Sequence, residues 1–350
     1  MVSENCGTVS IGVRLPIIRA GDNLAEIVCA EVIKNVVLED RDVIGITESL
    51  VARAQNNYVT VDEIASETDR LFGKNATIII MEPIYSRNRF SMILKGIARS
   101  AKKLIFSCPD IDEVGNVWGF NPWTGVDIKK YYQEICDSEN CEFKTFELND
   151  KEIYSLPMLL CNLHNVADTE NDEDIFTLMD YFPDKCEYGL LGSNKATEEK
   201  VKLFPKKYES VKLIRDIQKS IKLLLNKDVE VMIYGDGCFK DPDSGIWEFA
   251  DPVTSPAYTD GLEGSPNEIK LKAFADDKYK DLKGKELKEA IKEEIRHKKS
   301  NLHNNMASQG TTPRRYVNLL ASLMDLTSGS GDKGTPVVVV KNYFKNYADA

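Results

Sequence analysis

Short apolar runs alternate with amphipathic stretches along the first third of the chain, and this alternation limits the folds open to it. Three runs are apolar or rich in β-branched residues, as interior strands are: 43–46, 76–81 and 103–106. Three stretches carry apolar residues near a helical period: 23–35, 62–72 and 88–101. Strands that alternate with helices in this way predict a mixed α/β fold.

Polar residues mark where two of these helices begin. Asp22 is expected to cap the first helix, and Thr60 and Asp62 precede the second. Later parts of the chain add one helix and two strands to the predicted fold: 208–226, 229–234 and 337–340. The strand at 229–234 leads to Asp236, and carboxylates just past a strand's carboxyl end commonly face a binding crevice.

The composition excludes several classes of protein. The 350 residues are 42% hydrophobic and 29% charged, with a net charge of −11, which argues against broad binding to nucleic acid. No apolar run approaches the ~20 residues of a membrane helix. The N-terminus lacks a basic region followed by an apolar stretch, so no signal peptide is expected. The sequence therefore predicts a cytoplasmic protein that binds neither nucleic acid nor a membrane.

Cysteine and histidine usage limits the metal chemistry. The eight cysteines are scattered without a CxxC pair, and several, such as Cys29 and Cys108, lie within apolar patterns. Free, buried thiols are therefore expected instead of disulfides. The three histidines are His164, His297 and His303. A histidine-based zinc centre is disfavoured, whereas carboxylates from separate loops could hold a hard divalent cation.

Two regions differ in character from their surroundings. Acidic stretches alternate with aromatic patches over 109–188, which predicts an elaborated insertion with solvated loops. Residues 270–304 are strongly charged, and Leu287, Ile291 and Ile295 give this stretch only a narrow apolar stripe. It is expected to form an exposed helix, with Glu294 paired to a lysine four residues later.

Several separated segments, taken together, point to one family. They are IGVRLPIIRAGDNLAEI at 11–27, DRDVIGITESLVARAQNNYV at 40–59, GLLGSNKATEEKVKLFPKKYESVKLIR at 189–215, YGDGCF at 234–239 with YTDG at 258–261, and LMDLTSGSGDKGTPVVVVKNY at 323–343. Their order resembles the coenzyme F-420 γ-glutamyl ligase family. That family is similar in reading Pro-[IL]-Ile-x-x-Gly-Asp-[DN]-Leu first, Gly-[IV]-Asp-x-Ser-Asn in the middle and Gly-x-Pro-Val-Val-Val-Val at the end. The resemblance covers roughly 8–343 and is poor at 109–188 and 265–310.

The resemblance implies a fold, an assembly and a reaction. Members of the family join glutamate to a carboxylate at the expense of GTP with a divalent metal, Mg²⁺ or Mn²⁺, and form an intertwined α/β homodimer. The domains expected on this basis are an N-terminal ligase-like part at 8–108, the insertion at 109–188 and a C-terminal ligase-like part at 189–345.

Two aspartates are the expected metal ligands and catalytic residues. Asp236 follows a strand and lies between glycines, and Asp260 lies in the YTDG segment. Both match aspartates of the ligase pattern, and carboxylate oxygens suit Mg²⁺ and Mn²⁺. In the alternative interpretation each aspartate caps a turn.

The central segment departs from the family pattern. Ser193 and Asn194 match its Ser-Asn, which places their hydroxyl and amide groups near the nucleotide or metal, although Gly-Ser-Asn is also ordinary turn sequence. The same alignment puts Leu191 where the family has aspartate. Either another acid, such as Asp184 or Glu187, substitutes for it, or the two-metal arrangement is incomplete.

The second segment departs as well. Arg53 keeps a cation where the family has its second lysine and is expected to be catalytic, while Ser49 and Ala52 replace the first lysine and the serine. Glu48 remains a candidate metal ligand, and Ser49 a candidate nucleotide contact. The pattern suggests a divergent subfamily whose acceptor differs from the deazaflavin coenzyme.

Two further segments hold candidate binding groups. Arg87, with Asn88 and Arg89, follows the strand at 76–81 and opens a helix, which suits a nucleotide phosphate or a carboxylate, although surface arginines are usually solvated. The glycine-rich stretch at 326–336 precedes a strand, the reverse of the order in a Walker phosphate loop. By spacing alone it is a flexible turn.

The resemblance implies a GTP-dependent amide ligase that activates an acid as an acyl phosphate and joins it to glutamate or another amino acid. One alternative keeps this chemistry with a folate-like or other acid as the acceptor. Another is an inactive nucleotide-binding homologue, motivated by Leu191. A nicotinamide-dependent oxidoreductase is disfavoured because no G-x-G-x-x-G follows a strand.

Overall fold

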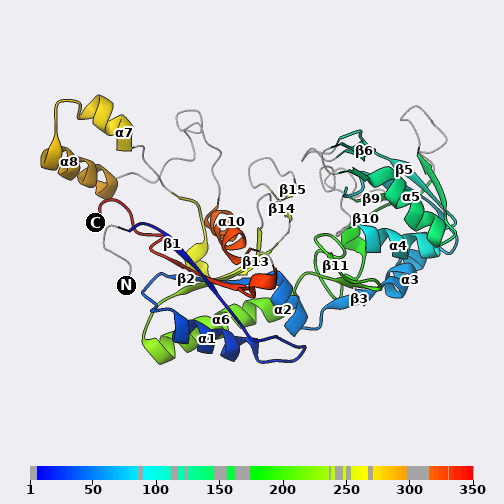
Figure 1. Ribbon diagram of the computed structural model, residues 1–350, viewed down its shortest axis with the longest axis horizontal. Coiled ribbons are helices and arrows are strands. Elements are labelled where there is room, and N and C mark those ends of the chain that lie inside the picture. The colour runs from blue at the N-terminus through cyan, green and yellow to red at the C-terminus, as the bar shows by residue number, and fades with distance from the viewer. Residues whose placement is uncertain are drawn as a thin grey trace.

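The chain forms two lobes that lie side by side (Figure 1). The computed structural model describes residues 6–85, 90–111, 117–122, 125–145, 156–161, 174–235, 238–240, 247–249, 254–266, 271–297, 315–329 and 331–349. The first lobe holds both ends of the chain, and the second is built from 58–204. No helix in the described part combines the length and apolar character that a membrane span requires.

A five-stranded mixed sheet forms the centre of the first lobe. Its strands lie in the order β1 (Val9–Val13), β17 (Val337–Lys341), β2 (Val43–Thr47), β13 (Glu230–Gly235) and β16 (Thr254–Tyr258). Only β2 and β13 run parallel, and β17 pairs with both β1 and β2. The sheet therefore joins segments from the start, middle and end of the chain.

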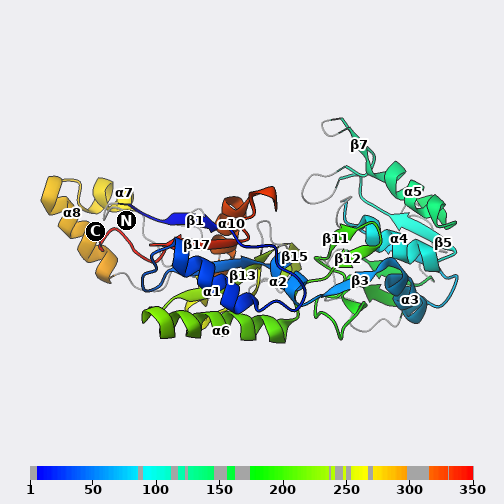
Figure 2. The same cartoon turned by 60° about the horizontal axis from the view of Figure 1, so that its bottom comes forward.

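Helices cover both faces of this sheet (Figure 2). On one face lie α1 (Leu24–Asn35) and α6 (Lys207–Leu225), and on the other lies α10 (Tyr316–Ser328). α10 can approach closely because β2 has a glycine under it: a Cβ on Gly45 would lie 2.1 Å from Met324 Sδ. The sheet is thus buried on both faces, as its apolar strands predict.

The second lobe contains a five-stranded parallel sheet. Its strands lie in the order β10 (Ile175–Thr177), β9 (Met158–Leu160), β4 (Thr77–Met81), β5 (Lys103–Ser107) and β8 (Glu142–Thr145). The helices of the lobe are α3 (Val61–Phe72), α4 (Ser91–Ser100) and α5 (Ile128–Ser138). The expected boundary after residue 108 lies directly behind β5, so residues expected in two different domains share this sheet.

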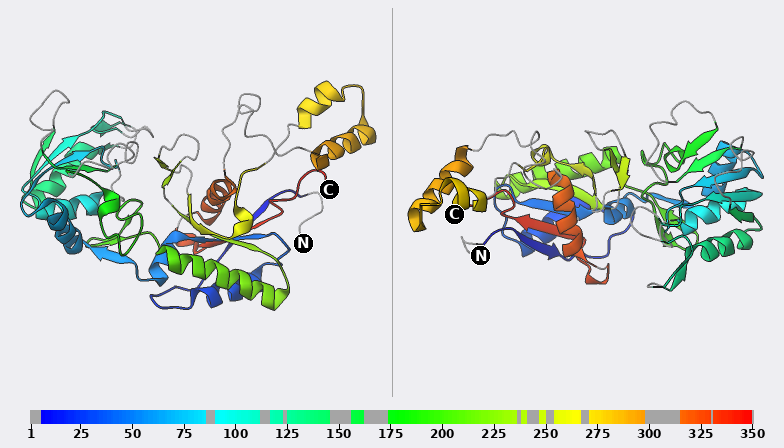
Figure 3. Two further views of the ribbon diagram at one scale, coloured as in Figure 1. Left: turned by 180° about the vertical axis from the view of Figure 1, so that it is seen from behind. Right: turned by 90° about the horizontal axis from the view of Figure 1, so that it is seen from above.

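A small antiparallel sheet stands where the second lobe meets the first (Figure 3). It consists of β11 (Asn194–Thr197), β12 (Lys200–Lys202) and β3 (Tyr58–Thr60), in that order. The Asn57 side chain donates to the Phe204 carbonyl at 2.6 Å, and Leu203 N donates to the Asn57 carbonyl at 3.1 Å. These bonds bring the entry to the second lobe and the exit from it together.

The start of α3 agrees with the prediction from the sequence, whereas the cap of α1 differs from it. Thr60 caps α3 in a reciprocal capping box with Glu63, close to the expected start. The expected cap of α1 is wrong, because the Asn23 side chain accepts from Glu26 N. Asp22 instead accepts a hydrogen bond from Arg19 N at 2.7 Å and closes the turn before the helix.

The remaining elements extend from the two lobes. Short hairpin strands are β6 (Phe120–Asn121), β7 (Val126–Asp127), β14 (Cys238–Lys240) and β15 (Trp247–Phe249). The charged excursion holds α7 (Leu271–Ala273) and α8 (Gly284–His297). Glu294 on α8 bonds to Lys278 and Tyr279, while the lysine expected as its partner lies outside the described residues.

The seven cysteines whose side chains the structure describes are free, and five of them are buried as predicted, whereas Cys6 is exposed. Cys29 is buried beside α6, and Cys108 is half-buried. The predicted mixed α/β architecture is confirmed by the two sheets and the helices around them.

Candidate functional site

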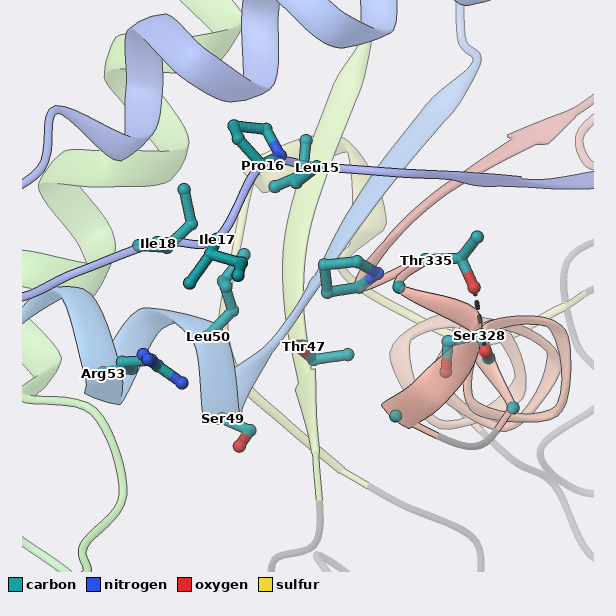
Figure 4. Close-up of a pocket in the computed structure, with 14 residues that line it drawn as sticks. Leu15, Pro16, Ile17, Ile18, Thr47, Ser49, Leu50, Arg53, Ser328 and Thr335 are labelled. Atoms are coloured by element: carbon teal, nitrogen blue, oxygen red, sulfur yellow. Dashed lines mark hydrogen bonds between the residues drawn. The ribbon is translucent and has the colours of Figure 1, made fainter.

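A pocket of about 430 Å³ opens in the first lobe where three of the segments singled out in the sequence meet (Figure 4). The first segment, the helix that follows β2, and the glycine-rich stretch before β17 each provide a wall. The lining residues are Leu15, Pro16, Ile17, Ile18, Thr47, Ser49, Leu50, Arg53, Ser328, Gly329, Gly331, Gly334, Thr335 and Pro336. Residues more than 300 positions apart thus share one cavity.

The first wall is the apolar strip Leu15–Ile18, which follows β1. Leu15 N donates to the Gly334 carbonyl at 3.3 Å, so the strip continues the contact between β1 and the stretch before β17. Ile18 is 2% exposed and belongs to the core, whereas Ile17 is 82% exposed. One isoleucine anchors the strip and the other offers an apolar surface beside the pocket.

The second wall is α2 (Glu48–Ala54), a short helix that begins directly after β2. Ser49, Leu50 and Arg53 line the pocket from this helix. Leu50 and Arg53 share one side of α2 because three residues approach one helical turn. Arg53 is the cation among the residues that line the pocket.

The third wall is the turn between α10 and β17. The Thr335 hydroxyl donates to the Ser328 carbonyl at 2.9 Å and closes this turn across the glycines (Figure 4). The turn is tied to the end of β2 because Thr47 N donates to the Pro336 carbonyl at 2.9 Å. Gly329 has a φ of +60°, a conformation that glycine adopts without strain.

The electrostatic character of the pocket differs between its ends. The carboxyl end of α10 at Ser328 carries partial negative charge from the helix dipole, whereas Arg53 stands on the facing wall. Burial raises the pKa of Tyr234, whose hydroxyl lies next to Ser328, so this phenol stays neutral. Anionic groups of a ligand are therefore favoured at the Arg53 end.

Glu48 points away from the pocket lining and into the joint between the lobes. Its carboxylate lies 2.9 Å from the Lys202 ammonium, and the two residues are 5% and 8% exposed. Gly235 packs against it so closely that a Cβ there would lie 1.7 Å from Glu48 Cγ. The expected metal ligand Glu48 is thus a buried partner of a lysine at the carboxyl ends of β2 and β13.

The two expected metal-binding aspartates are not seen together. Asp236 lies outside the described residues, and Gly235, which precedes it, ends β13. Asp260 lies at the opposite end of β13, where the neighbouring Thr259 bonds to Glu230. Its side chain is 96% exposed, with Arg215 at 3.9 Å. The five residue steps of β13 between these ends span about 17 Å.

The central segment begins in the second lobe, enters α6 of the first lobe at Lys207, and contributes nothing to the pocket lining. Ser193 is buried, and the Asn194 side chain donates to the Gly192 carbonyl at 3.4 Å. Leu191 is 1% exposed and packs in the apolar core of the second lobe. Glu187, one candidate to replace the missing aspartate, pairs with Lys207 at 3.1 Å, and Asp184 is exposed.

The other site predictions have mixed outcomes. Ser49 and Arg53 both line the pocket, while Arg87 lies outside the described residues. Among the residues that the structure describes, no group of three His, Cys, Asp or Glu side chains could hold a metal ion.

Sequence reasoning missed several residues of the site. Pro16, Leu50 and Thr335 line the pocket, and Lys202 holds Glu48. The first three lie within the segments that resemble the family, yet ordinary apolar and hydroxyl residues carry no separate signal. Lys202 could have been suspected from its place in the strand-like run KVKLF, where a lysine faces either solvent or a buried acid.

The comparison with known protein families agrees with the convergence of these segments. The family model described as F420-0:Gamma-glutamyl ligase matches residues 12–342. No curated protein matches the chain. The matched range includes all three walls of the pocket and both lobes. It also covers 109–188 and 265–310, where the resemblance of the motifs is poor. The chain therefore belongs to the F420-0:gamma-glutamyl ligase family.

Proposed function

We propose that this ligase binds GTP in the pocket of the first lobe and uses it to activate a carboxylic acid. The observation that carries the proposal is the meeting of three family-like segments around Arg53. The apolar strip Leu15–Ile18 and Leu50 suit the flat faces of a base and ribose. Arg53 suits phosphate oxygens, which it can contact with two N–H groups at once.

The orientation follows from the charges of the walls. The phosphates are assigned to the Arg53 end, because the partial negative charge at the end of α10 repels them. The base then lies toward Ser328, where backbone carbonyls favour N–H donors. Guanine offers such donors at its N1 and N2 positions, whereas adenine offers one amino group. The two donors of guanine therefore favour GTP over ATP.

The proposed reaction has two steps. An oxygen of the acceptor carboxylate attacks the γ-phosphorus, GDP leaves, and an acyl phosphate forms. The amino group of glutamate or another amino acid then attacks the acyl carbon, and phosphate leaves as the amide bond forms and a proton is released. Arg53 would offset negative charge on the phosphates. Mg²⁺ or Mn²⁺, when bound, supplies further positive charge at the phosphate oxygens.

The assignment of metal ligands is also part of this proposal. Glu48 and Gly235, the residue before Asp236, lie at one end of the sheet, and Asp260 lies at the other end of β13. We retain Asp236 and Asp260 as proposed metal ligands, together with Glu48. We also retain the homodimer as a proposal. Three further residues stay candidate nucleotide contacts. Ser193 and Asn194 lie away from the pocket lining, and Arg87 lies outside the described residues.

One observation favours a second candidate function. Leu191 occupies an apolar core position where the family pattern has aspartate. A protein that binds nucleotide without completing the ligation would tolerate this change. An acceptor other than the deazaflavin coenzyme, such as a folate-like acid, is the corresponding variant of the active ligase.

Calorimetric titration with GTP, ATP and GDP, each with and without Mn²⁺, tests the pocket. We expect metal-dependent binding that Arg53→Met weakens roughly tenfold, about 1.4 kcal/mol, and that Arg53→Lys partly restores. Arg296→Met on α8 removes an exposed arginine far from the pocket and serves as the control. Wild-type protein that binds none of these nucleotides would overturn the proposal.

Isotope transfer tests the chemistry. A panel of carboxylates labelled with ¹⁸O is incubated with GTP, Mn²⁺ and glutamate, and the released phosphate is analysed by mass spectrometry. Acyl phosphate formation moves one ¹⁸O atom from the acceptor to phosphate. Nucleotide binding without label transfer or amide product for any acceptor would favour the inactive homologue.

A further inference from the structure

The buried ion pair between Lys202 and Glu48 joins the two lobes. Lys202 ends β12 in the second lobe, and Glu48 starts α2 in the first lobe. Nζ and Oε1 lie 2.9 Å apart, and both residues are more than nine-tenths buried. A buried ion pair seldom stabilises a fold more than an apolar pair of the same size would.

The helix that carries Glu48 depends on outside contacts for its position. α2 has seven residues, too few for a stable helix on its own, and the Thr47 side chain makes no capping hydrogen bond. Glu48 is the first residue of this helix and is enclosed by Gly235 on β13 and Lys202 on β12. These contacts fix the start of α2.

The backbone that presents Lys202 is itself firmly held. Lys202 pairs with Tyr58 in the ladder between β12 and β3. The next two residues bond to Asn57, through Leu203 N and the Phe204 carbonyl. Asn57 in turn donates its backbone N–H to the Ala52 carbonyl of α2 at 2.9 Å. The backbone around Lys202 is therefore connected to both ends of α2. Asn57 bonds to Ala52 near the end of the helix, and Lys202 itself pairs with Glu48 at its start.

We propose that Lys202 is a positioning residue of the nucleotide pocket, acting through Glu48 to hold α2 and thereby to set Ser49, Leu50 and Arg53 on the pocket wall. In this arrangement the second lobe helps to form a site whose lining lies entirely in the first lobe. The inference rests on the proposed function in that the pocket is taken to bind nucleotide.

Substitutions of Lys202 separate the effect of its charge from the effect of its size. Lys202→Met keeps the length of the side chain and removes the charge, whereas Lys202→Arg keeps the charge. Lys200→Met changes an exposed lysine two residues earlier on the same strand and serves as the matched control. Glu48→Gln and the double variant Lys202→Met/Glu48→Gln complete a thermodynamic cycle.

Two measurements are made on each variant. Calorimetry gives the dissociation constant for GTP with Mn²⁺, and hydrogen exchange with mass spectrometry follows peptides that cover 48–54. We expect Lys202→Met to weaken binding roughly tenfold and to speed exchange in α2, and Lys202→Arg to restore most of both. The double variant should bind GTP no more weakly than the weaker-binding single variant, because both substitutions break the same ion pair.

The outcomes distinguish this inference from the proposed function. Unchanged binding and unchanged exchange in Lys202→Met would overturn the positioning role. So would a loss of binding that is additive with Glu48→Gln and not restored by arginine. If the wild type binds no nucleotide, the proposed function fails, and the exchange of 48–54 still decides whether Lys202 holds α2.

Discussion

Gly235 and Glu48 are in such close contact that a Cβ on the glycine would lie 1.7 Å from the glutamate Cγ. The two residues end β13 and begin α2, and the register of the parallel strands places Tyr234 beside Thr47. The absence of a side chain at position 235 is therefore what lets Glu48 reach Lys202. This contact joins the carboxyl end of the sheet to the wall of the pocket.

The first prediction concerns this contact. Gly235→Ala should displace the Glu48 side chain and destabilise the protein by about 1–3 kcal/mol, because the packed carboxylate cannot move away without breaking its ion pair. Weaker nucleotide binding should accompany the loss. Chemical denaturation and calorimetry measure both effects. Gly119→Ala, where a Cβ meets nothing within 4 Å, is the control and should behave as the wild type.

Leu191 provides the second prediction. Leu191→Asp restores the residue type of the family pattern but places a carboxylate in an apolar core, so it should destabilise the protein by roughly 3–5 kcal/mol. It should add no Mn²⁺ binding. Leu191→Met should cost less than about 1.5 kcal/mol. A stable Leu191→Asp protein with a new metal site would show that this position still faces a metal centre.

The third prediction concerns the buried pair of Asp42 and Lys341. The Lys341 ammonium lies 2.5 Å from the carboxylate and also donates to the Val37 carbonyl at 2.7 Å, which ties the end of β17 to the loop before β2. Lys341→Met should cost about 3 kcal/mol, because it leaves a buried charge unpaired. Lys345→Met breaks only the exposed pair with Glu39 and should cost less than about 1 kcal/mol. Equal effects in urea unfolding would contradict this reasoning.

Thiol reactivity is the fourth prediction. Burial raises the pKa of Cys29 and of Cys186 to about 11 in each case. At pH 8 such a thiol is about one part in a thousand thiolate, and its labelling should increase as the pH rises toward 11. Cys6 is exposed and should react first with iodoacetamide. Peptide mass spectrometry gives the order, and labelling in denaturant should remove the difference. Rapid labelling of Cys29 in the folded protein at pH 8 would contradict its burial.

The interior elements of the fold could be predicted because each carries a local signal. The runs at 43–46, 76–81 and 337–340 are confirmed as β2, β4 and β17, since β-branched residues suit strands buried on both faces. The predicted helices at 23–35 and 208–226 are confirmed as α1 and α6 within about two residues at each end.

Elements that depend on distant partners could not be predicted. The apolar run Met158–Leu160 in β9 is short and becomes a strand only because it pairs with β4 and β10. The domain boundary after 108 followed a change in composition, yet the parallel sheet crosses it. Composition reports which residues are solvated and not which strands pair.

The site was predictable only in part, for a related reason. Ser49 and Arg53 were found through the resemblance, and they do line the pocket. Lys202 was missed because its role depends on an acid 154 positions earlier in the chain. Asp260 was grouped with Asp236 by pattern, and the antiparallel pairing of β13 with β16 puts Asp260 at the far end of the sheet from Gly235.

The position of β17 between β1 and β2 determines when the first lobe can fold during synthesis on the ribosome. The first lobe cannot close its sheet until residue 341 has left the exit tunnel, whereas the strands that the structure describes in the second lobe are all synthesised by residue 202. We expect stalled chains that end near residue 240 to protect α3 and α4 from protease while α1 is still cleaved. Protection of α1 at that length would contradict this order. The pocket residues that come from 15–53 would then stay unfolded until the last strand has been synthesised.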